Sequence, residues 1–488
     1  MRAARRLAVA IPSLLVAAGL SACSGQSAPS ANTEVAPAAP TPILLDAHDA
    51  SAASIAASGA LFSSSDLAFV ATPETVEDLV DDAHAAAAPL LIAGPGLADE
   101  LARLDVATVA AVDPAAIGDV AGRTVITVAA DGVDPQVAPA ESATAGGSSV
   151  LLTDGSVDQG VQSAVAANVE IAGGTTASMP EGDPRATSET VALAHQYADA
   201  TVLALGDSFG APEEFAERFA SASTQPDLPG GGQLPLKDKM LIAEYGHPGD
   251  PVLGVLGERD LDAAVEHVKT QAAAYEGLTD KTIVPTFEII TTIASGSKGD
   301  GDYSDEADIE TLRPWVERAG EEGIYVVLDL QPGTDTFLEQ AKQYEELLKL
   351  PHVGLALDPE WKLLPGQQHL EQIGSVETPE INETLAWLAE LTASNGLPQK
   401  VVVLHQFRLD MIPDRDQVDT SHDELAILVH VDGHGNPGDK MATWETLNED
   451  LPEGMQLGWK NFIDEDQPMF TPEETVAIEP HPVFVSYQ

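Results

Sequence analysis

Short apolar runs alternate with helical patterns between about Leu61 and Ala222. The runs are nearly continuous in Val, Ile, Leu and Ala, which is typical of parallel strands that are covered on both faces. Helical stretches such as Gln159 to Ala167 lie between them. The predicted strands are Leu67 to Ala71, Pro89 to Ala93, Thr108 to Val112, Thr124 to Ala129, Ser149 to Thr153 and Thr201 to Leu205. We therefore predict an α/β domain with a mostly parallel sheet over residues 61–225.

A Pro- and Gly-rich break from Pro226 to Gly232 predicts a domain boundary. The residues after it, 240–488, have the length of a (β/α)₈ barrel, which is about 250 residues. Phe337, Ala341 and Tyr344 are spaced as one apolar helix face. Eight strand-like runs are present: Met240 to Tyr245, Thr282 to Ile289, Ile324 to Leu330, Val353 to Asp358, Lys400 to Phe407, Leu425 to Val431, Gln456 to Phe462 and Pro482 to Gln488. We predict a TIM-like barrel in which the Arg408 to Glu424 connection is only weakly helical.

Polar and aromatic residues gather at the carboxyl ends of seven of these runs, where barrel active sites form. Four acids that follow apolar strands are the predicted catalytic residues: Glu244, Asp329, Asp358 and Glu288. The predicted binding residues are Gln331, Glu360, Trp361, His405, His430, Asp432, Trp459 and Asn461. Alternatively, such acids cap helices or pair with nearby arginines.

Acids and aromatic rings at one barrel end suit a sugar polymer, because carboxylates act as acid, base or nucleophile and rings stack on pyranoses. The segments Leu328 to Pro332, Leu357 to Trp361 and Trp459 to Asn461 resemble a glycoside-hydrolase-type barrel. They match no specific hydrolase family. The chain is also similar to a group of uncharacterised wall-associated lipoproteins from high-GC Gram-positive bacteria, a likeness that implies no activity.

The first 22 residues have the pattern of a secretory signal: arginines, then the apolar stretch Leu7 to Leu20, then small residues. Leu20-Ser21-Ala22-Cys23 resembles the bacterial lipobox, which implies cleavage before Cys23 and a lipid on its thiol. An ordinary signal peptide beside a coincidental cysteine is the alternative. Ser24 to Pro42 is rich in Ser, Ala and Pro, and we predict a flexible tether over residues 23–60.

The charge limits the possible partners. Asp and Glu number 78 against 23 Lys and Arg, a formal charge of −55. Nucleic acid is excluded as a partner, because its binding requires Lys and Arg to neutralise phosphates. Anionic lipid headgroups would also repel the chain, so we expect acyl chains on Cys23 to hold it at the outer face of the membrane. A single Cys excludes a disulfide scaffold and multi-cysteine metal sites.

Two motifs in the first domain resemble the type-2 cell-wall-binding repeat of Gram-positive surface proteins. Gly206-Asp207-Ser208-Phe209 looks like the turn of that family, and Arg185-Ala186-Thr187 looks like its Arg-x-x-Thr stretch. Ile171 to Gly174 looks like its Gly-Gly strand end. The resemblance implies a Rossmann-like repeat that binds cell-wall polysaccharide. The alternative is an α/β spacer that binds nothing.

Three hypotheses follow, in order. The first is a lipid-anchored envelope protein that binds or hydrolyses cell-wall glycan through barrel carboxylates, with no metal or other cofactor. The second is a non-catalytic surface lipoprotein that binds glycan or a partner. The third is a metal-dependent hydrolase, for which at least three of His405, His430, Asp432 and His434 would have to converge. No Gly-x-Ser-x-Gly motif is present, which disfavours an esterase.

Overall fold

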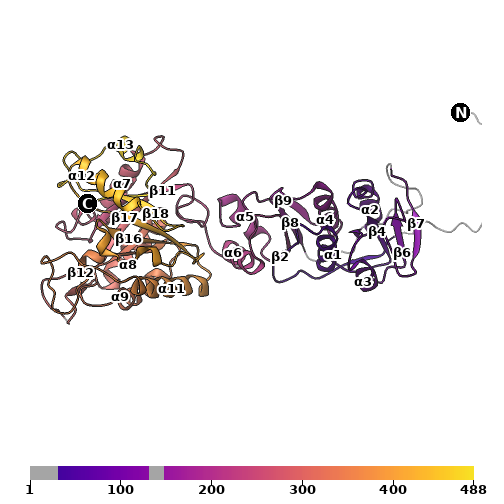
Figure 1. Ribbon diagram of the computed structural model, residues 1–488, viewed down its shortest axis with the longest axis horizontal. Coiled ribbons are helices and arrows are strands. Elements are labelled where there is room, and N and C mark those ends of the chain that lie inside the picture. The colour runs from indigo at the N-terminus through magenta and orange to yellow at the C-terminus, as the bar shows by residue number, and fades with distance from the viewer. Residues whose placement is uncertain (1–30, 131–147, 300) are drawn as a thin grey trace, which may run out of the picture.

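The structure, a computed structural model, describes residues 31–130, 148–299 and 301–488. The predicted signal peptide and Cys23 lie outside the described residues. The chain forms an elongated N-terminal part and a wider C-terminal barrel (Figure 1). No helix in the described ranges is long and apolar enough to cross a membrane.

The N-terminal part contains two four-stranded parallel sheets. The first has the order β5 (Leu90–Ile92), β4 (Leu67–Ala71), β6 (Thr108–Ala111), β7 (Thr124–Thr127). The second has the order β2 (Ile43–Leu44), β10 (Thr201–Leu205), β8 (Ser149–Thr153), β9 (Thr175–Ser178). A short antiparallel pair, β1 (Thr33–Val35) and β3 (Phe62–Ser65), lies beside them. The prediction of parallel sheets is confirmed, and there are two of them.

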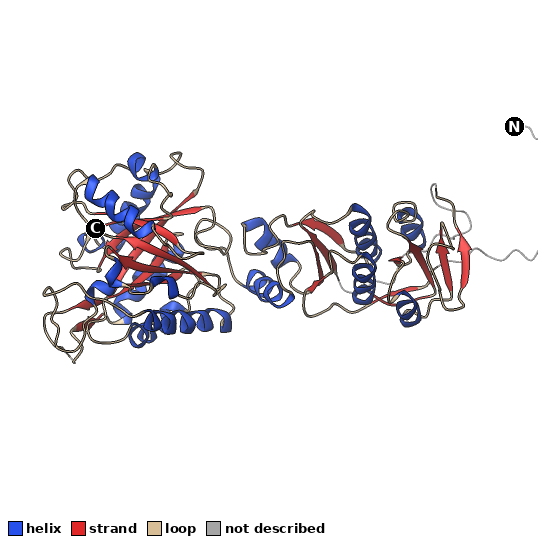
Figure 2. Ribbon diagram, viewed as in Figure 1, coloured by secondary structure: helices blue, strands red, loops and turns tan. Residues whose placement is uncertain are grey.

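Helices α1 (Ala50–Leu61) and α4 (Gln159–Ile171) lie between the two sheets (Figure 2). One apolar core joins both sheets through these helices and includes Ala53 and Ala57. The remaining helices of this part are α2 (Val80–Ala86), α3 (Leu97–Arg103), α5 (Ser188–Gln196) and α6 (Pro212–Thr224).

The folded domain begins earlier than the sequence predicted. We expected a flexible tether over residues 23–60, but its described part contains β1, β2 and most of α1. The composition that indicates a flexible segment, small Ala and Ser residues, also lets a helix approach a sheet closely. Ser54 is fully buried in α1, and its hydroxyl accepts a hydrogen bond from the Ile92 amide at 3.0 Å.

The C-terminal part is a closed barrel of eight parallel strands, as predicted, because β11 pairs with both β12 and β19. The strands are β11 (Lys239–Gly246), β12 (Thr282–Ala294), β14 (Tyr325–Leu330), β15 (Val353–Leu357), β16 (Lys400–Gln406), β17 (Leu425–Val431), β18 (Gln456–Asn461) and β19 (Phe484–Tyr487). A short strand, β13 (Ser304–Glu306), pairs antiparallel with the end of β12.

Helices surround most of the barrel, which makes it TIM-like. They are α7 (Leu261–Ala273), α8 (Ile309–Glu321), α9 (Phe337–Gln343), α10 (Glu345–Leu348), α11 (Thr378–Ser394), α12 (Pro437–Asn448) and α13 (Pro472–Val476). The connection from β16 to β17 contains only the 3₁₀ turns η3 (Leu409–Met411) and η4 (Arg415–Gln417). Two further 3₁₀ turns, η1 (Val255–Glu258) and η2 (Pro359–Trp361), follow β11 and β15.

Residues of the barrel strands alternate between two buried environments. One large core lies between the sheet and the helices and takes Met240 and Ile242 from β11. A second core fills the lower half of the barrel interior and takes Leu241 and Ala243 from the same strand. Because both faces are buried, each strand reads as a continuous apolar run even though its side chains alternate.

The N-terminal part packs on the amino-terminal end of the barrel strands. Asp423, just before β17, accepts from Arg185 at 2.9 Å and from two nitrogens of Arg218 at 2.7 and 3.0 Å. The carboxyl ends of the strands therefore open at the far end of the molecule, at the left of Figure 1. We call this end the barrel mouth.

Candidate functional site

The upper half of the barrel interior is polar, in contrast to its apolar lower half. Ionisable and hydrogen-bonding side chains that alternate with outward-facing residues meet there. They are Tyr245, Glu288, Asp329, Gln331, Asp358, His405, His430, Asp432, Lys460 and Ser486. Seven of these ten are among the predicted catalytic and binding residues, and the structure brings these seven together.

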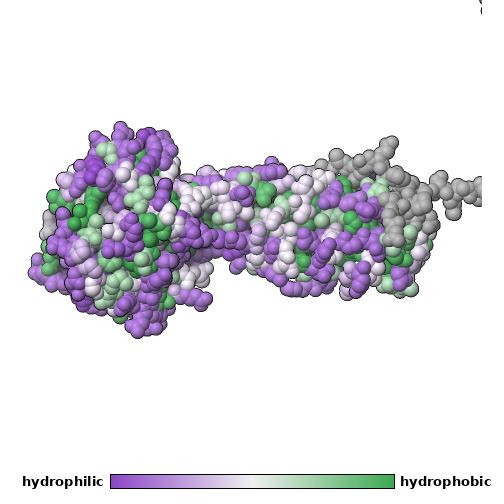
Figure 3. Space-filling view, turned by 90° about the horizontal axis from the view of Figure 1, so that it is seen from above, coloured by the Kyte–Doolittle hydropathy of each residue, from purple (hydrophilic) through white to green (hydrophobic). Residues whose placement is uncertain are grey.

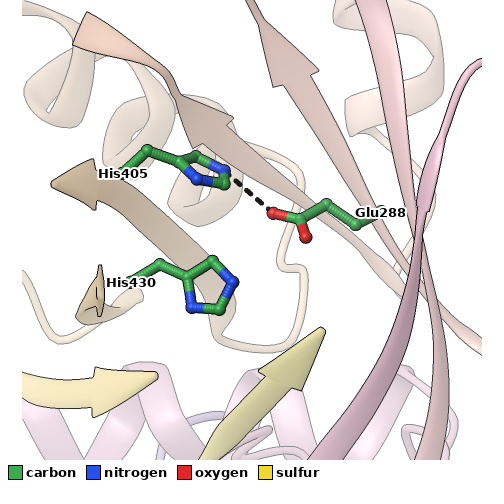
Figure 4. Close-up of side chains that lie close together, drawn as sticks. All are labelled: Glu288, His405 and His430. Carbon is green, nitrogen blue, oxygen red and sulfur yellow. Dashed lines mark hydrogen bonds and ion pairs between the residues drawn. The ribbon is translucent and has the colours of Figure 1, made fainter. Parts of the chain in front are cut away.

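His405 is the centre of this group. Its Nδ1 lies 3.0 Å from Asp432 Oδ2, and its Nε2 lies 3.0 Å from Glu288 Oε1. Asp329 Oδ1 is 3.7 Å from the same Nε2. The imidazole therefore lies among three carboxyl groups that come from three other strand ends, and both ring nitrogens face an acid. Figure 4 shows the contact with Glu288.

Tyr245 connects this cluster to the space above it. Its hydroxyl donates to Asp329 Oδ2 at 2.9 Å and accepts from Gln331 Nε2 at 3.3 Å. Lys460 Nζ lies 3.7 Å from the centroid of the Tyr245 ring, a cation–π distance. The ring thus separates the buried acids from a lysine that faces the cavity described below.

His430 lies next to His405, with ring centroids 5.2 Å apart. Its Nε2 is 2.7 Å from Ser486 Oγ, and its ring packs edge-on against Phe484 at 5.0 Å. The neighbouring strand carries Gly458 at this level. A Cβ atom there would come within 2.6 Å of His430 Nδ1, so the glycine makes room for the imidazole.

Burial and mutual charge set the protonation of the cluster. Burial and the neighbouring Glu288 raise the pKa of Asp329 to about 6, although His405 and Tyr245 oppose the shift. Burial alone would lower the pKa of His405, but Glu288 and Asp432 outweigh it and hold that pKa well above its usual value. For Asp432, burial is outweighed by the hydrogen bond from His405, so its pKa is lowered.

A cavity of about 470 Å³ lies above the cluster at the barrel mouth. Its polar lining includes Asp358, Glu360 and Asp432, and its apolar lining includes Trp361, Phe407 and Phe462. Large apolar side chains also lie exposed on loops that follow the strands at this end: Val252, Leu364, Leu370, Leu409 and Ile463. Figure 3 shows hydrophobic areas, in green, on the surface of the barrel.

Asp358 and Glu360 enter the cavity from one strand end, two residues apart. Asp358 directly follows β15 and is 3% exposed, and its Oδ1 accepts from the Glu360 amide at 3.2 Å. Burial raises the pKa of Asp358 well above its usual value. The nearby His405 lowers this pKa, whereas Asp329 and Asp432 raise it further. Burial and then Asp432 also raise the pKa of Glu360. This strand end thus supplies carboxyl groups that hold protons unusually well.

Three predicted site residues lie outside both the polar interior group and the cavity. Glu244 is buried on the outer face of β11, where its carboxylate pairs with His267 Nδ1 of α7. Trp459 packs among the helices with a ring centroid 5.7 Å from that of Trp444, and its Nε1 donates to Asn461 Oδ1 at 2.8 Å. We predicted all three at the mouth, and the alternation of the strands places them outside it.

Tyr245, Lys460 and Ser486 are interior residues that the prediction left out of the site. Tyr245 is adjacent to Glu244, and Lys460 lies between Trp459 and Asn461. The alternation of side chains along a strand would have identified them, because residues that face the barrel interior are two positions apart. On β11 this series runs Leu241, Ala243 and Tyr245.

The structure also changes the set of residues that the third hypothesis, a metal-dependent hydrolase, would require. Among the described residues, the group that could hold an ion is Glu288, His405 and His430, with one ligand atom from each within 4.8 Å of the others (Figure 4). Asp432 instead contacts the far nitrogen of His405. His434 lines the cavity and packs against Phe462 with ring centroids 5.7 Å apart.

Comparison of the chain with protein-family models, with curated proteins and with solved structures gives no match. The chemistry of the barrel mouth is therefore inferred from its own residues.

Proposed function

We propose that this is a lipid-anchored cell-envelope protein whose barrel binds a cell-wall glycan and hydrolyses a glycosidic bond in it. One observation carries the proposal. Asp358 and Glu360 share the wall of one cavity at the barrel mouth, and burial raises the pKa of each. A carboxyl group with a raised pKa keeps its proton to higher pH and can serve as a general acid.

Glycoside hydrolysis uses two carboxyl groups on either side of the bond. In our proposal Glu360 donates its proton to the glycosidic oxygen as the bond to the anomeric carbon breaks. Water adds to that carbon and passes its proton to a second carboxylate. Asp432 is the candidate for this base, because it lines the same cavity from the end of β17. Asp358 holds the Glu360 backbone through its hydrogen bond to the amide.

The walls of the cavity suit a sugar. Aromatic rings stack on the apolar faces of pyranoses, and Trp361, Phe407 and Phe462 are available for this. Gln331 and Lys460 also line the cavity and supply donors for hydroxyl groups. The volume of about 470 Å³ is within the usual range of small-molecule sites. A few sugar rings of a longer polymer would therefore enter the mouth.

The arrangement of the two parts supports a role in the wall. The N-terminal part packs on the end of the barrel opposite the mouth. If the chain is anchored through Cys23, as the lipobox-like quartet indicates, the N-terminal part lies between the membrane and the barrel. The mouth would then be directed away from the membrane, towards wall polysaccharide.

The test of hydrolysis compares the full chain, purified in detergent, with Glu360→Gln and Asp358→Asn on peptidoglycan, arabinogalactan and aryl-glycosides. We expect Glu360→Gln to lose roughly 10²- to 10⁴-fold in turnover, the usual value of a general acid. Asp358→Asn should lose less, because the Asn side-chain oxygen can still accept from the Glu360 amide. Glu244→Gln is the matched control, because that acid is buried in the same barrel but faces outwards. Equal losses in Glu244→Gln would contradict the proposed roles.

A pH profile sharpens the assignment. If a protonated Glu360 is required, turnover declines as pH rises through its raised pKa. The Glu360→Gln variant cannot lose a proton at this position, so its residual turnover should lack that alkaline decline. An unchanged profile in the variant would remove Glu360 as the acid.

The anchor has its own test. We expect Cys23→Ser to abolish incorporation of a labelled fatty acid and to release the chain from membranes. Retention of the label in Cys23→Ser would contradict the anchor and leave the proposed barrel chemistry untouched.

A non-catalytic glycan-binding protein is the second candidate. It is favoured by the engagement of Glu288 and Asp432 with His405, which leaves fewer acids free for chemistry. Binding of wall polysaccharide without turnover by the unmodified chain would support it. Asp358→Asn would then leave affinity nearly unchanged, whereas Trp361→Ala would weaken binding.

A further inference from the structure

The floor of the barrel mouth contains carboxylate oxygens that are buried without a hydrogen-bond partner. Glu288 Oε2 and Asp329 Oδ1 are two of them, and both residues are 0% exposed. A buried carboxylate oxygen that lacks a partner costs free energy, since it has lost its water and gained nothing in return. Both belong to the cluster around His405, with Asp329 Oδ1 only 3.7 Å from its Nε2.

The donors around this point come from three strands of the closed barrel, of which β16 and β17 are neighbours and β12 is adjacent to neither. Glu288 is on β12, His405 on β16 and His430 on β17. One ligand atom from each lies within 4.8 Å of the other two. Ligands of one ion with bonds of ~2.1 Å are separated by up to ~4.2 Å, so a small adjustment would place all three around one ion. Figure 4 shows both imidazole rings and the carboxylate turned towards a common space.

The surroundings of His405 match those of a metal ligand. Metal-binding histidines usually donate their second ring N–H to a carboxylate, which fixes the ring and its tautomer. His405 Nδ1 lies 3.0 Å from Asp432 Oδ2, which leaves Nε2 facing the acids. His430 Nε2 has the Ser486 hydroxyl at 2.7 Å, and this hydroxyl can rotate away or stay as a neighbour of the ion.

We infer that Glu288, His405 and His430 bind one divalent first-row transition-metal ion in the floor of the barrel, with the Asp329 carboxylate beside it, 3.7 Å from His405 Nε2. Imidazole nitrogens favour zinc, iron or a similar ion over magnesium and calcium, which prefer oxygen. Three protein ligands of this kind suit zinc, which accepts two imidazoles and a carboxylate and completes its tetrahedron with a further oxygen.

This site is distinct from the proposed hydrolytic site. Glu288, Asp329, His405 and His430 are fully buried, and none lines the cavity. The ion would bind beneath the cavity and hold the ends of β12, β16 and β17 together. Asp432 connects the two sites, because it lines the cavity and binds His405. The ion would thereby position Asp432 without touching the substrate.

The test measures metal content and affinity directly. The full chain is stripped with a chelator and titrated with zinc by calorimetry, and bound metal is then counted by mass spectrometry. We expect one zinc per chain. The Glu288→Gln, His430→Gln double variant should bind none at this site, and Asp432→Asn should lose roughly 10- to 100-fold in affinity, as outer-shell changes do.

Two controls separate this proposal from the hydrolytic one. Glu360→Gln should bind zinc as the unmodified chain does even if turnover is lost. Glu244→Gln removes an equally buried acid from the outer face and should also retain zinc. Absence of turnover would therefore leave the zinc result unaffected. Absence of zinc binding would likewise leave the result for Glu360→Gln turnover unaffected.

A spectroscopic measurement avoids dependence on variants that fold poorly. Cobalt(II) added to the stripped chain should give the visible absorption of a four- or five-coordinate site with nitrogen ligands, and zinc should displace it. Absence of this absorption, or equal zinc content in the unmodified chain and the double variant, would overturn the proposal. The cluster would then be a network of buried ion pairs.

Discussion

The barrel wall carries two glutamate–histidine pairs, one on each face. Glu288 and His405 meet inside the barrel, and both side chains are 0% exposed. Glu244 and His267 meet outside it, where the His267 side chain is 38% exposed. The two glutamates are on adjacent strands, β11 and β12, and both are fully buried. Burial of an acid is therefore a poor guide to function in this fold.

The surroundings of the two pairs differ more than the pairs do. The inner histidine also contacts Asp432 and lies near Asp329, and all of these groups are cut off from water. The outer histidine has one acid and open access to solvent. A charge that loses its partner outside can be hydrated, whereas a charge that loses its partner inside cannot. Matched variants on the two faces should separate these cases.

The largest effect is expected from Glu288→Gln, which removes a charged partner of His405 inside the barrel. Breaking a buried pair typically costs about 3–5 kcal/mol in the free energy of unfolding. Glu244→Gln should cost only about 1 kcal/mol, because water can replace the lost partner of His267. Urea unfolding followed by tryptophan fluorescence measures both, since all five tryptophans lie in the barrel, between residues 315 and 459.

Equal losses for the two variants would mean that the inner acids share the charge of His405 so well that one is dispensable. The triple arrangement of Glu288, Asp329 and Asp432 would then have to be dissected by double-mutant cycles.

The next effect concerns Lys400, a lysine that is fully buried at the start of β16. Its Nζ donates to the carbonyls of Leu350 and Val353 at 3.0 and 2.8 Å, and burial lowers its pKa to about 7. In the unfolded chain a lysine has a pKa of ~10.4. Between these values the unfolded state binds more protons, so stability rises with pH.

We therefore expect the unfolding free energy of the unmodified chain to increase relative to Lys400→Met as pH rises from about 7 to 10. The difference should change by up to ~1.4 kcal/mol for each pH unit within this window. Parallel stability curves for the two proteins would show that Lys400 keeps its charge in the fold.

A smaller effect is expected from the tyrosine hydroxyls on the two faces. Tyr245→Phe inside the barrel leaves Asp329 Oδ2 without its donor and should cost about 2 kcal/mol. Tyr275→Phe outside removes a hydroxyl whose partner is the Tyr487 hydroxyl at 2.6 Å, and this should cost about 1 kcal/mol. The same fluorescence assay compares them, and a reversed order would contradict the difference between the faces.

The sequence predicted the barrel well for a physical reason. Parallel strands that are covered on both sides are apolar along their whole length, so all eight could be located by composition alone. The same continuity hides which residues face inwards. Glu244 was chosen over Tyr245 for this reason, and Trp459 and Asn461 over Lys460.

The sequence did not predict which individual side chains contact one another across the barrel. Nothing local in the sequence indicates that His405 meets Glu288, which is 117 residues away, or that Asp432 binds the opposite side of the same ring. The helix α1 was missed for another reason. Its Ala- and Ser-rich sequence has no apolar stripe, and it is helical because two sheets enclose it.

The contact between the two parts of the molecule has a mechanical consequence. Asp423 receives both Arg185 and Arg218, Ser221 Oγ donates to the Leu397 carbonyl at 3.2 Å, and each part has its own core. A rotation between the two parts at these contacts would move the mouth, at the opposite end of the barrel, farther than the strand ends next to the contacts. The direction in which the cavity points is thus governed at the end of the barrel farthest from it.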